Sequence, residues 1–326
     1  MGMGMGMVMG MDIINLSCDS FRSMKKFEKI ILVTGSHRSG STWLGKMLSL
    51  DEDTGYIHEP FNIVHVNSPF KEWFFHVHND LPKGRINEIR SFLDRYMYLS
   101  TTRLFSDISQ ANSIKSAVKL LRDFYRVGRN QWTCSNLIVK DPIAILSAEW
   151  LASSYNMSVV MLVRHPAAFV GSLKIGDTQH DFNHFLRQPV LMERYLQPFQ
   201  EEIQFFAKNP QPVIDQAILL WNIIHQCIYE YHIKHPDFIL VRHEDMSIDP
   251  LKTFEVLYNK LGLQFSKQVK EKLLSYTSTN DEKIGIKRDS VANIKSWKGR
   301  LTEVEVKRIY DATQPFSAKF YNNEDW

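Results

Sequence analysis

The sequence has few cysteines, no long apolar run and little excess charge of either sign. Its cysteines are Cys18, Cys134 and Cys227, an odd number without a C-x-x-C pair, so neither a disulfide framework nor a cysteine zinc site is expected. Reduced thiols of this kind are typical of a cytoplasmic protein. No apolar stretch reaches about 18 residues, so we expect no membrane span.

The net charge of +3 over 326 residues is too small for a general nucleic-acid-binding protein, which usually carries a strong basic patch. It suits a pocket for one polyanionic small molecule. The first eleven residues, MGMGMGMVMGM, are of low complexity and lack the basic start of a secretion signal. We expect residues 1–24 to form a flexible tail and residues 25–326 a single domain, because no linker rich in Pro, Gly and Ser divides them.

Short apolar, β-branched runs alternate with helical patterns along the chain. The runs lie at 27–34, 137–140, 158–163 and 238–241. This alternation predicts an α/β fold, a three-layer sandwich with a central parallel sheet. Two long aromatic-rich segments, at about 62–135 and 175–236, are expected to be helical insertions. They should shape a substrate pocket at the carboxyl ends of the strands, where open α/β sheets bind ligands.

A turn rich in glycine and serine, Gly35–Thr42, follows the first strand and opens a helix. Backbone N–H groups in such a turn, together with the helix N-terminus, bind anions. The glycine spacing matches the ATP-binding pattern G-x-x-x-x-G-K-[ST], but Ser41 stands in place of the lysine that serves a triphosphate. We therefore predict a P-loop-like phosphate-binding loop in which Arg38 supplies the positive charge.

The run from Arg38 to Leu44, RSGSTWL, resembles the 5'-phosphosulfate loop of sulfotransferases that use 3'-phosphoadenosine-5'-phosphosulfate (PAPS). The resemblance covers roughly residues 28–310. It implies PAPS as donor, the bisphosphate PAP as product and no metal. It also implies that Arg38 stabilises charge developing on the bridging oxygen, and that the phosphosulfate is bound by Arg38, Ser39, Gly40, Ser41, Thr42 and Trp43.

A second segment, Arg164 to Ser172, resembles the part of the same family that binds the ribose 3'-phosphate. Arg164 ends a strand and Ser172 lies two helical turns further on, so both can face one anion. His165 stands where the family usually has an aspartate, which we interpret as a helix cap whose loss affects stability more than chemistry.

Two weaker matches follow toward the C-terminus. His243 replaces a tyrosine that lies near the adenine in relatives. The segment with Ser290, Asn293, Trp297 and Lys298 is similar to the one that closes over the nucleotide, so Trp297 and Lys298 are assigned to cofactor binding. Whether Arg288, Lys298 or Arg300 contacts the phosphate stays open.

Glu59 is the expected general base. It lies in Ile57-His58-Glu59-Pro60 and matches the Phe-Glu-Pro of Golgi-type carbohydrate sulfotransferases, whose glutamate is thought to be the base. Lys140-Asp141 stands where cytosolic small-molecule sulfotransferases carry a catalytic lysine and histidine. Lys140 is therefore expected to be an electrostatic helper, with Asp141 as the alternative base.

These observations predict a sulfotransferase that acts on a sugar or another small-molecule alcohol. The alternatives are a P-loop nucleotide or small-molecule kinase and a non-catalytic nucleotide-binding module. Five aromatic residues either stack on an acceptor or fill the core: Trp73, Phe74, Phe75, Trp132 and Phe182. Acceptor identity and oligomeric state are left open.

Overall fold

The computed structural model describes residues 27–65, 67–98, 108–109, 113–277 and 294–326. The expected N-terminal tail 1–24 lies outside the described residues. So do four residues singled out in the sequence, Cys18, Arg288, Ser290 and Asn293.

Five parallel strands form the central sheet, in the order β2-β3-β1-β4-β5. In chain order they are β1 (Lys29–Gly35), β2 (Thr54–His58), β3 (Asn136–Lys140), β4 (Met157–Val163) and β5 (Ile239–Arg242). The four runs expected from the sequence are all strands. The fifth, β2, leads into Glu59 at the edge of the sheet.

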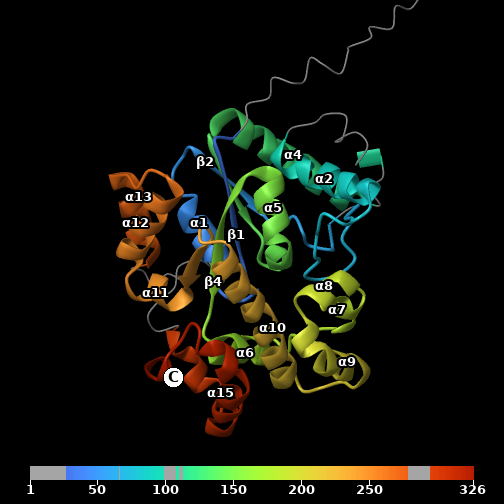
Figure 1. The fold of residues 1–326 in the computed structure, drawn as a ribbon. Coiled ribbons are helices and arrows are strands. Elements are labelled where there is room, and N and C mark those ends of the chain that lie inside the picture. Colours follow the sequence, from blue (N-terminus) through green and yellow to red (C-terminus); the bar gives the residue numbers. More distant parts are fainter. Residues whose placement is uncertain (1–26, 66, 99–107, 110–112, 278–293) are drawn as a thin grey trace, which may run out of the picture.

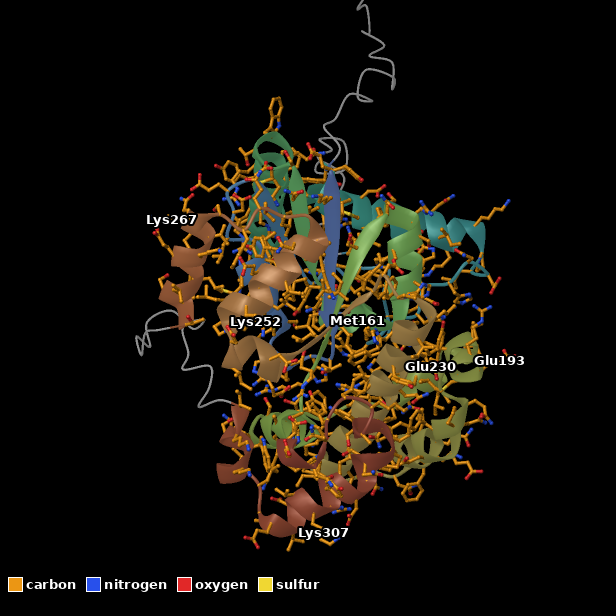
Figure 2. The ribbon with its side chains drawn as sticks, turned by 60° about the vertical axis from the view of Figure 1, so that its left-hand side comes forward. Met161, Glu193, Glu230, Lys252, Lys267 and Lys307 are labelled. Atoms are coloured by element: carbon orange, nitrogen blue, oxygen red, sulfur yellow. The ribbon has the colours of Figure 1, made fainter. Side chains whose placement is uncertain are left out.

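Alternating side chains of the strands enter two separate cores. Ile31 and Val33 pack on α1 (Ser41–Leu48), α12 (Pro250–Leu261) and α13 (Lys267–Thr277). Leu32 faces the other way, toward α2 (Lys83–Met97), α5 (Ala148–Tyr155) and α10 (Val213–Lys234). Figure 2 shows both layers, with Lys252 and Lys267 on one side of the strand of Met161 and Glu230 on the other. The predicted three-layer α/β fold is confirmed.

The remaining described helices flank these layers. They are α4 (Ile114–Thr133), α6 (Pro166–Ile175), α7 (Asn183–Leu186), α8 (Pro189–Arg194), α9 (Gln200–Lys208), α11 (His243–Ile248) and α15 (Glu303–Ser317), with 3-10 turns at Pro142–Ser147, Gln197–Phe199, Ser296–Gly299 and Asn323–Asp325. Both α6 and α12 begin with the expected proline, and α12 ends at Gly262, whose φ of 63° closes it.

The segment 62–135 is less helical than expected. Its described residues 62–82 form turns and bends, because Pro69 lacks an N–H and the side chains of Asn62 and Ser68 bond to nearby backbone N–H groups. Within the described residues, no helix has the length and apolarity that a membrane crossing requires. The carboxyl ends of all five strands lie at the same edge of the sheet. In Figure 1 this edge faces α6 and α15.

Candidate active site

The phosphate loop turns sharply between β1 and α1. A Cβ at Gly35 would lie 2.2 Å from the Leu162 carbonyl oxygen, so only glycine fits there. Arg38 and Gly40 have φ values of 62° and 96°, and the Ser39 hydroxyl donates to the Ser36 carbonyl. This curled backbone leads directly into the N-terminus of α1, where free N–H groups can bind an anion.

The second predicted anchor meets this loop. Arg38 Nε donates to Ser172 Oγ at 3.1 Å, and Arg164 donates to the Arg38 carbonyl. Arg164 Nε is buried and finds no partner in the described part of the chain. Burial, and to a smaller degree the neighbouring Arg300 and Arg38, lowers the pKa of Arg164. Two guanidinium groups, one of which has an unsatisfied buried N–H, therefore converge where they can bind a phosphate.

The other residues assigned to the cofactor lie around these anchors. Trp43 is partly exposed on α1, with its ring 5.4 Å from that of Phe254 in a T-shaped contact. Trp297 is buried and stacks on His165, with centroids 5.4 Å apart. Lys298 is exposed, with Nζ 5.1 Å over the Trp297 ring. The charge of Arg300 contributes to lowering the pKa of Arg164, so Arg300 lies near the anion-binding cluster.

Glu59 follows β2 at the same edge, in a left-handed conformation with φ 49°. Its N–H donates to the Lys140 carbonyl at 2.7 Å, and its Oε1 lies 2.5 Å from Lys140 Nζ. The Lys140 side chain is 0% exposed and that of Glu59 24%. Burial alone would raise the pKa of Glu59, but the hydrogen bond and charge of Lys140 hold it below its ordinary value. The structure therefore holds Glu59 as a carboxylate that solvent can reach.

Asp141 has a different environment. Its two oxygens accept the backbone N–H groups of Phe61 at 2.6 Å and Ile143 at 3.2 Å, and it is fully buried. Burial raises its pKa to about 7. Both oxygens are used to hold the start of the Pro142–Ser147 turn, which leaves Asp141 little access to an acceptor.

A wall of aromatic and histidine side chains extends from the loop; its histidines, His37 and His180, were not predicted from the sequence. The His37 ring lies 5.4 Å from Phe169 and 5.8 Å from Phe74, and Phe74 in turn lies 5.9 Å from His180. Burial lowers the pKa of His37 to about 4 and that of His180 to about 3, so both are neutral near pH 7. Of the five candidate aromatics, Phe74 and Phe182 are buried in this wall, while Trp132 is exposed on α4.

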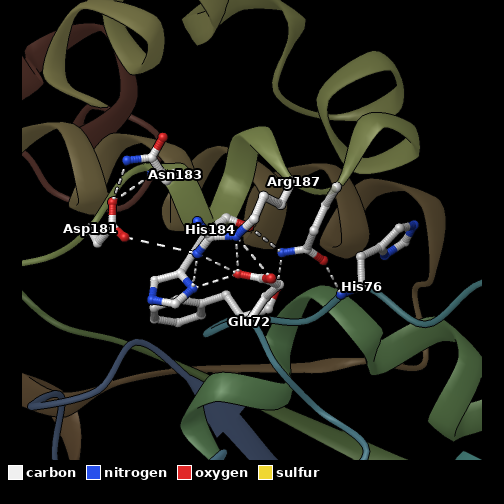
Figure 3. Close-up of polar contacts among 8 residues, drawn as sticks. Glu72, His76, Asp181, Asn183, His184 and Arg187 are labelled. Carbon is white, nitrogen blue, oxygen red and sulfur yellow. Dashed lines mark hydrogen bonds and ion pairs between the residues drawn. The ribbon is translucent and has the colours of Figure 1, made fainter. Parts of the chain in front are cut away.

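Beyond His180 lies a polar cluster centred on Glu72 (Figure 3). Its carboxylate contacts His184 Nδ1 at 2.6 Å and accepts Arg187 Nε at 2.9 Å. Burial raises the pKa of Glu72, but the bonds from Arg187 and His184 outweigh it and leave the pKa below its ordinary value. Glu72 is more than 100 residues from its partners, and no spacing in the sequence links them.

In the part of the chain that the structure describes, no group of three or more His, Cys, Asp or Glu side chains could hold an ion. His65, six residues after Glu59, donates a hydrogen bond from Nε2 to the Glu59 carbonyl oxygen at 2.7 Å.

The chain is similar in sequence to a known protein family and to one curated protein. A family model described as "Sulfotransferase family" matches residues 31–267. Carbohydrate sulfotransferase 1 of Danio rerio is 36% identical over 82 residues, which are 24% of this chain and 19% of that protein, so the match spans less than a fifth of that relative.

Three solved structures are similar to this chain at low sequence identity. The sulfotransferase domain from the curacin biosynthetic pathway has a TM-score of 0.45 at 14% identity, covering 89% of this chain and 98% of that one. A mouse sulfotransferase complexed with PAP has a TM-score of 0.44 at 12% identity, covering 92% and 88%. Retinol dehydratase in a complex with retinol and PAP has a TM-score of 0.42 at 14% identity, covering 91% and 84%.

Proposed function

The chain belongs to the sulfotransferase family, whose model matches more than half of its residues, and we propose that it transfers a sulfuryl group from PAPS to an acceptor hydroxyl. The observation that carries this proposal is the meeting of two anion anchors beside a solvent-accessible carboxylate. Arg38 bonds to Ser172, Arg164 bonds to the Arg38 carbonyl, and Glu59 lies at the same carboxyl edge of the sheet.

The proposed donor site uses both anchors. The loop and the N-terminus of α1 receive the 5'-phosphosulfate, while Arg164 and Ser172 receive the 3'-phosphate. Trp297 supports the site from behind, because its ring packs on His165, the residue next to Arg164. We assign Lys298 and Trp43 to its rim. The loop residues assigned to the donor remain Arg38, Ser39, Gly40, Ser41 and Thr42.

In the proposed reaction, PAPS supplies an activated sulfuryl group whose bond to the phosphate oxygen breaks as a bond to the acceptor oxygen forms. Glu59 accepts the proton of the acceptor hydroxyl. Lys140 keeps Glu59 ionised and fixes the direction of its carboxylate. Arg38 lies where it can stabilise the negative charge that develops on the departing phosphate. Positioning of donor and acceptor and electrostatic stabilisation of the developing charge suffice to catalyse this transfer, as in phosphoryl transfer.

The acceptor in this proposal is a small-molecule or carbohydrate alcohol. Neutral His37 and His180 offer hydrogen bonds without adding charge, and the buried Phe74 ring packs between them. The local similarity to a carbohydrate sulfotransferase supports a sugar hydroxyl. We also propose that the protein acts in the cytoplasm, where its two described cysteines, both free and buried, stay reduced.

A direct test incubates the purified protein with sulfur-labelled PAPS and a panel of acceptors, comprising mono- and oligosaccharides, phenols and aliphatic alcohols. We expect transfer of label to at least one alcohol, with stoichiometric formation of PAP. An Arg164→Ala preparation is the control for non-enzymatic transfer. Binding of PAP without transfer to any acceptor would instead support a non-catalytic nucleotide-binding module.

A further inference from the structure

The outer face of α4 carries a continuous apolar stripe. Ile114, Val118, Leu121, Tyr125 and Trp132 are between 50% and 86% exposed. Their spacing of three and four residues, which Gly128 continues, places them along one side of the helix. Isolated exposed apolar residues are ordinary, but an aligned set on one helix marks an interaction surface.

A second stripe, offset by one residue, carries positive charge. It consists of Lys115, Lys119, Arg122, Arg126 and Arg129. The helix has a single acidic side chain, Asp123, which pairs with Arg126 at 2.8 Å. At about 100° per residue the basic stripe runs directly beside the apolar one, along one flank. Both stripes extend over nearly the whole helix.

Among the residues that the structure describes, packing within the protein does not use the apolar stripe. The residues of α4 that are buried are Val127, Asn130 and Gln131, on the opposite side of the helix. Through this side α4 lies on the edge strand β2 and next to α2 (Figure 1). Asn130 sits so closely over Gly55 that a Cβ there would come within 2.8 Å of it. The inward face holds the helix in place and leaves the apolar stripe exposed, while three of the five basic side chains are exposed and two are half-buried.

We propose that α4 docks the protein on an anionic lipid surface, with the apolar stripe inserted at the level of the headgroups and the basic stripe on their phosphates. A helix with this pattern lies in the plane of a membrane interface. Tyr125 and Trp132 are the aromatic types that prefer that depth. Lys and Arg beside the stripe find their counter-charge in acidic lipids.

Charge argues against a second copy of the chain as the occupant. Two α4 helices paired antiparallel through the apolar stripe would lay their basic flanks along each other. The single acid, Asp123, is already paired with Arg126, so it offers little compensation. An acidic bilayer supplies the missing negative charge along the full length of the helix.

The test is co-sedimentation of the full-length protein with vesicles of phosphatidylcholine alone or with about 30% phosphatidylserine. The wild type should bind the acidic vesicles and remain in the supernatant with the neutral ones. Val118→Glu should bind at least about tenfold more weakly. Arg122→Glu should bind at least about fivefold more weakly, the effect expected for one basic side chain near an anionic surface.

Matched controls separate docking from general charge. Val304→Glu changes a valine on α15 that is 80% exposed, and Lys267→Glu changes an exposed lysine at the start of α13. Both should bind like the wild type. If Val118→Glu fails to fold, as judged by circular dichroism, the test is the comparison of vesicle binding between Arg122→Glu and Lys267→Glu.

Three results would overturn the proposal. The first is wild-type protein that stays in the supernatant with acidic vesicles. The second is binding by Val118→Glu and Arg122→Glu that equals the wild type. The third is a wild-type dimer in sedimentation velocity that Val118→Glu dissociates, since that result assigns the apolar stripe to a second copy. None of these measurements uses sulfuryl transfer, so the proposal stands or falls independently of the proposed activity.

Discussion

The ion pair between Lys140 and Glu59 yields a prediction about stability that depends only on its burial. Lys140 is fully enclosed, with Nζ 2.5 Å from the Glu59 carboxylate, while about a quarter of the Glu59 side chain remains exposed. Glu59→Gln removes the carboxylate and keeps its shape. Lys140→Met removes the charge and roughly fills the same volume. The two single variants and the double variant form a thermodynamic cycle.

The two single substitutions should not lower the free energy of unfolding equally. Removing one partner of a buried pair costs about 3–5 kcal/mol, because the other charge is left without compensation. Glu59→Gln should approach that cost, since the ammonium it strands has no contact with water. Lys140→Met should cost less, about 1–3 kcal/mol, because the remaining carboxylate can be hydrated. The double variant should be more stable than Glu59→Gln alone, because it leaves no buried charge.

Urea denaturation of the four proteins at pH 7, followed by tryptophan fluorescence, measures these differences. The expected order of unfolding free energy is wild type, then Lys140→Met, then Glu59→Gln, with a coupling energy of at least about 1 kcal/mol. The reasoning is refuted if Glu59→Gln is as stable as the wild type, or if the effects of the single substitutions simply add in the double variant.

Three further predictions concern the same site. Arg164→Ala should weaken PAP binding about tenfold or more in calorimetry and leave binding of the analogue without the 3'-phosphate nearly unchanged; equal losses would contradict the assignment. Turnover should persist in excess EDTA, and activity that returns only with added magnesium would favour a kinase. Burial raises the pKa of Asp141 from 3.8 to about 7, so the folded state binds its proton more tightly than the unfolded state. Its contribution to stability is therefore fully present below pH 3.8 and is lost as the pH rises through about 7. Urea denaturation between pH 4 and 8 should show this slope in the wild type and a flatter one in Asp141→Asn; equal slopes would contradict it.

The sheet and the loop could be predicted because their signals are local. Each core strand is a short apolar run, and the turn after β1 combines two glycines with a helix start. Proline at the start of α12 and Gly262 at its end mark the helix limits in the same way. These patterns need no knowledge of which segments meet.

The pairings inside the site could not be predicted, because each depends on how the fold brings distant segments together. Glu59 and Lys140 are 81 residues apart and become neighbours only because β2 and β3 are adjacent and end together. Lys140 could be singled out through resemblance, but its full burial against Glu59 could not. Glu72 and Arg187 are 115 residues apart, and their contact depends on turns without a regular pattern.

The aromatic contacts of His165 could not be predicted from the sequence either. It occupies the N-cap position of α6 and makes no side-chain capping bond there. Its ring is instead enclosed by Trp297, Tyr321 and Trp326, and burial lowers its pKa to about 3. An aromatic cage of this kind is built from the far C-terminal end of the chain, and neighbouring positions in the sequence do not show it.

The central claim is that Glu59 takes the proton of the acceptor during transfer from PAPS. Single-turnover transfer from sulfur-labelled PAPS, compared between Glu59→Gln and Asp141→Asn, tests it most directly. Glu59→Gln should lower the transfer rate constant about 10²–10⁴-fold, while PAPS affinity, which we assign to Arg38, Arg164 and Ser172, stays close to that of the wild type. Asp141→Asn should retain most of the rate in whatever fraction is folded. Loss of transfer in folded Asp141→Asn, with a nearly wild-type rate in Glu59→Gln, would contradict the account and move the base to Asp141.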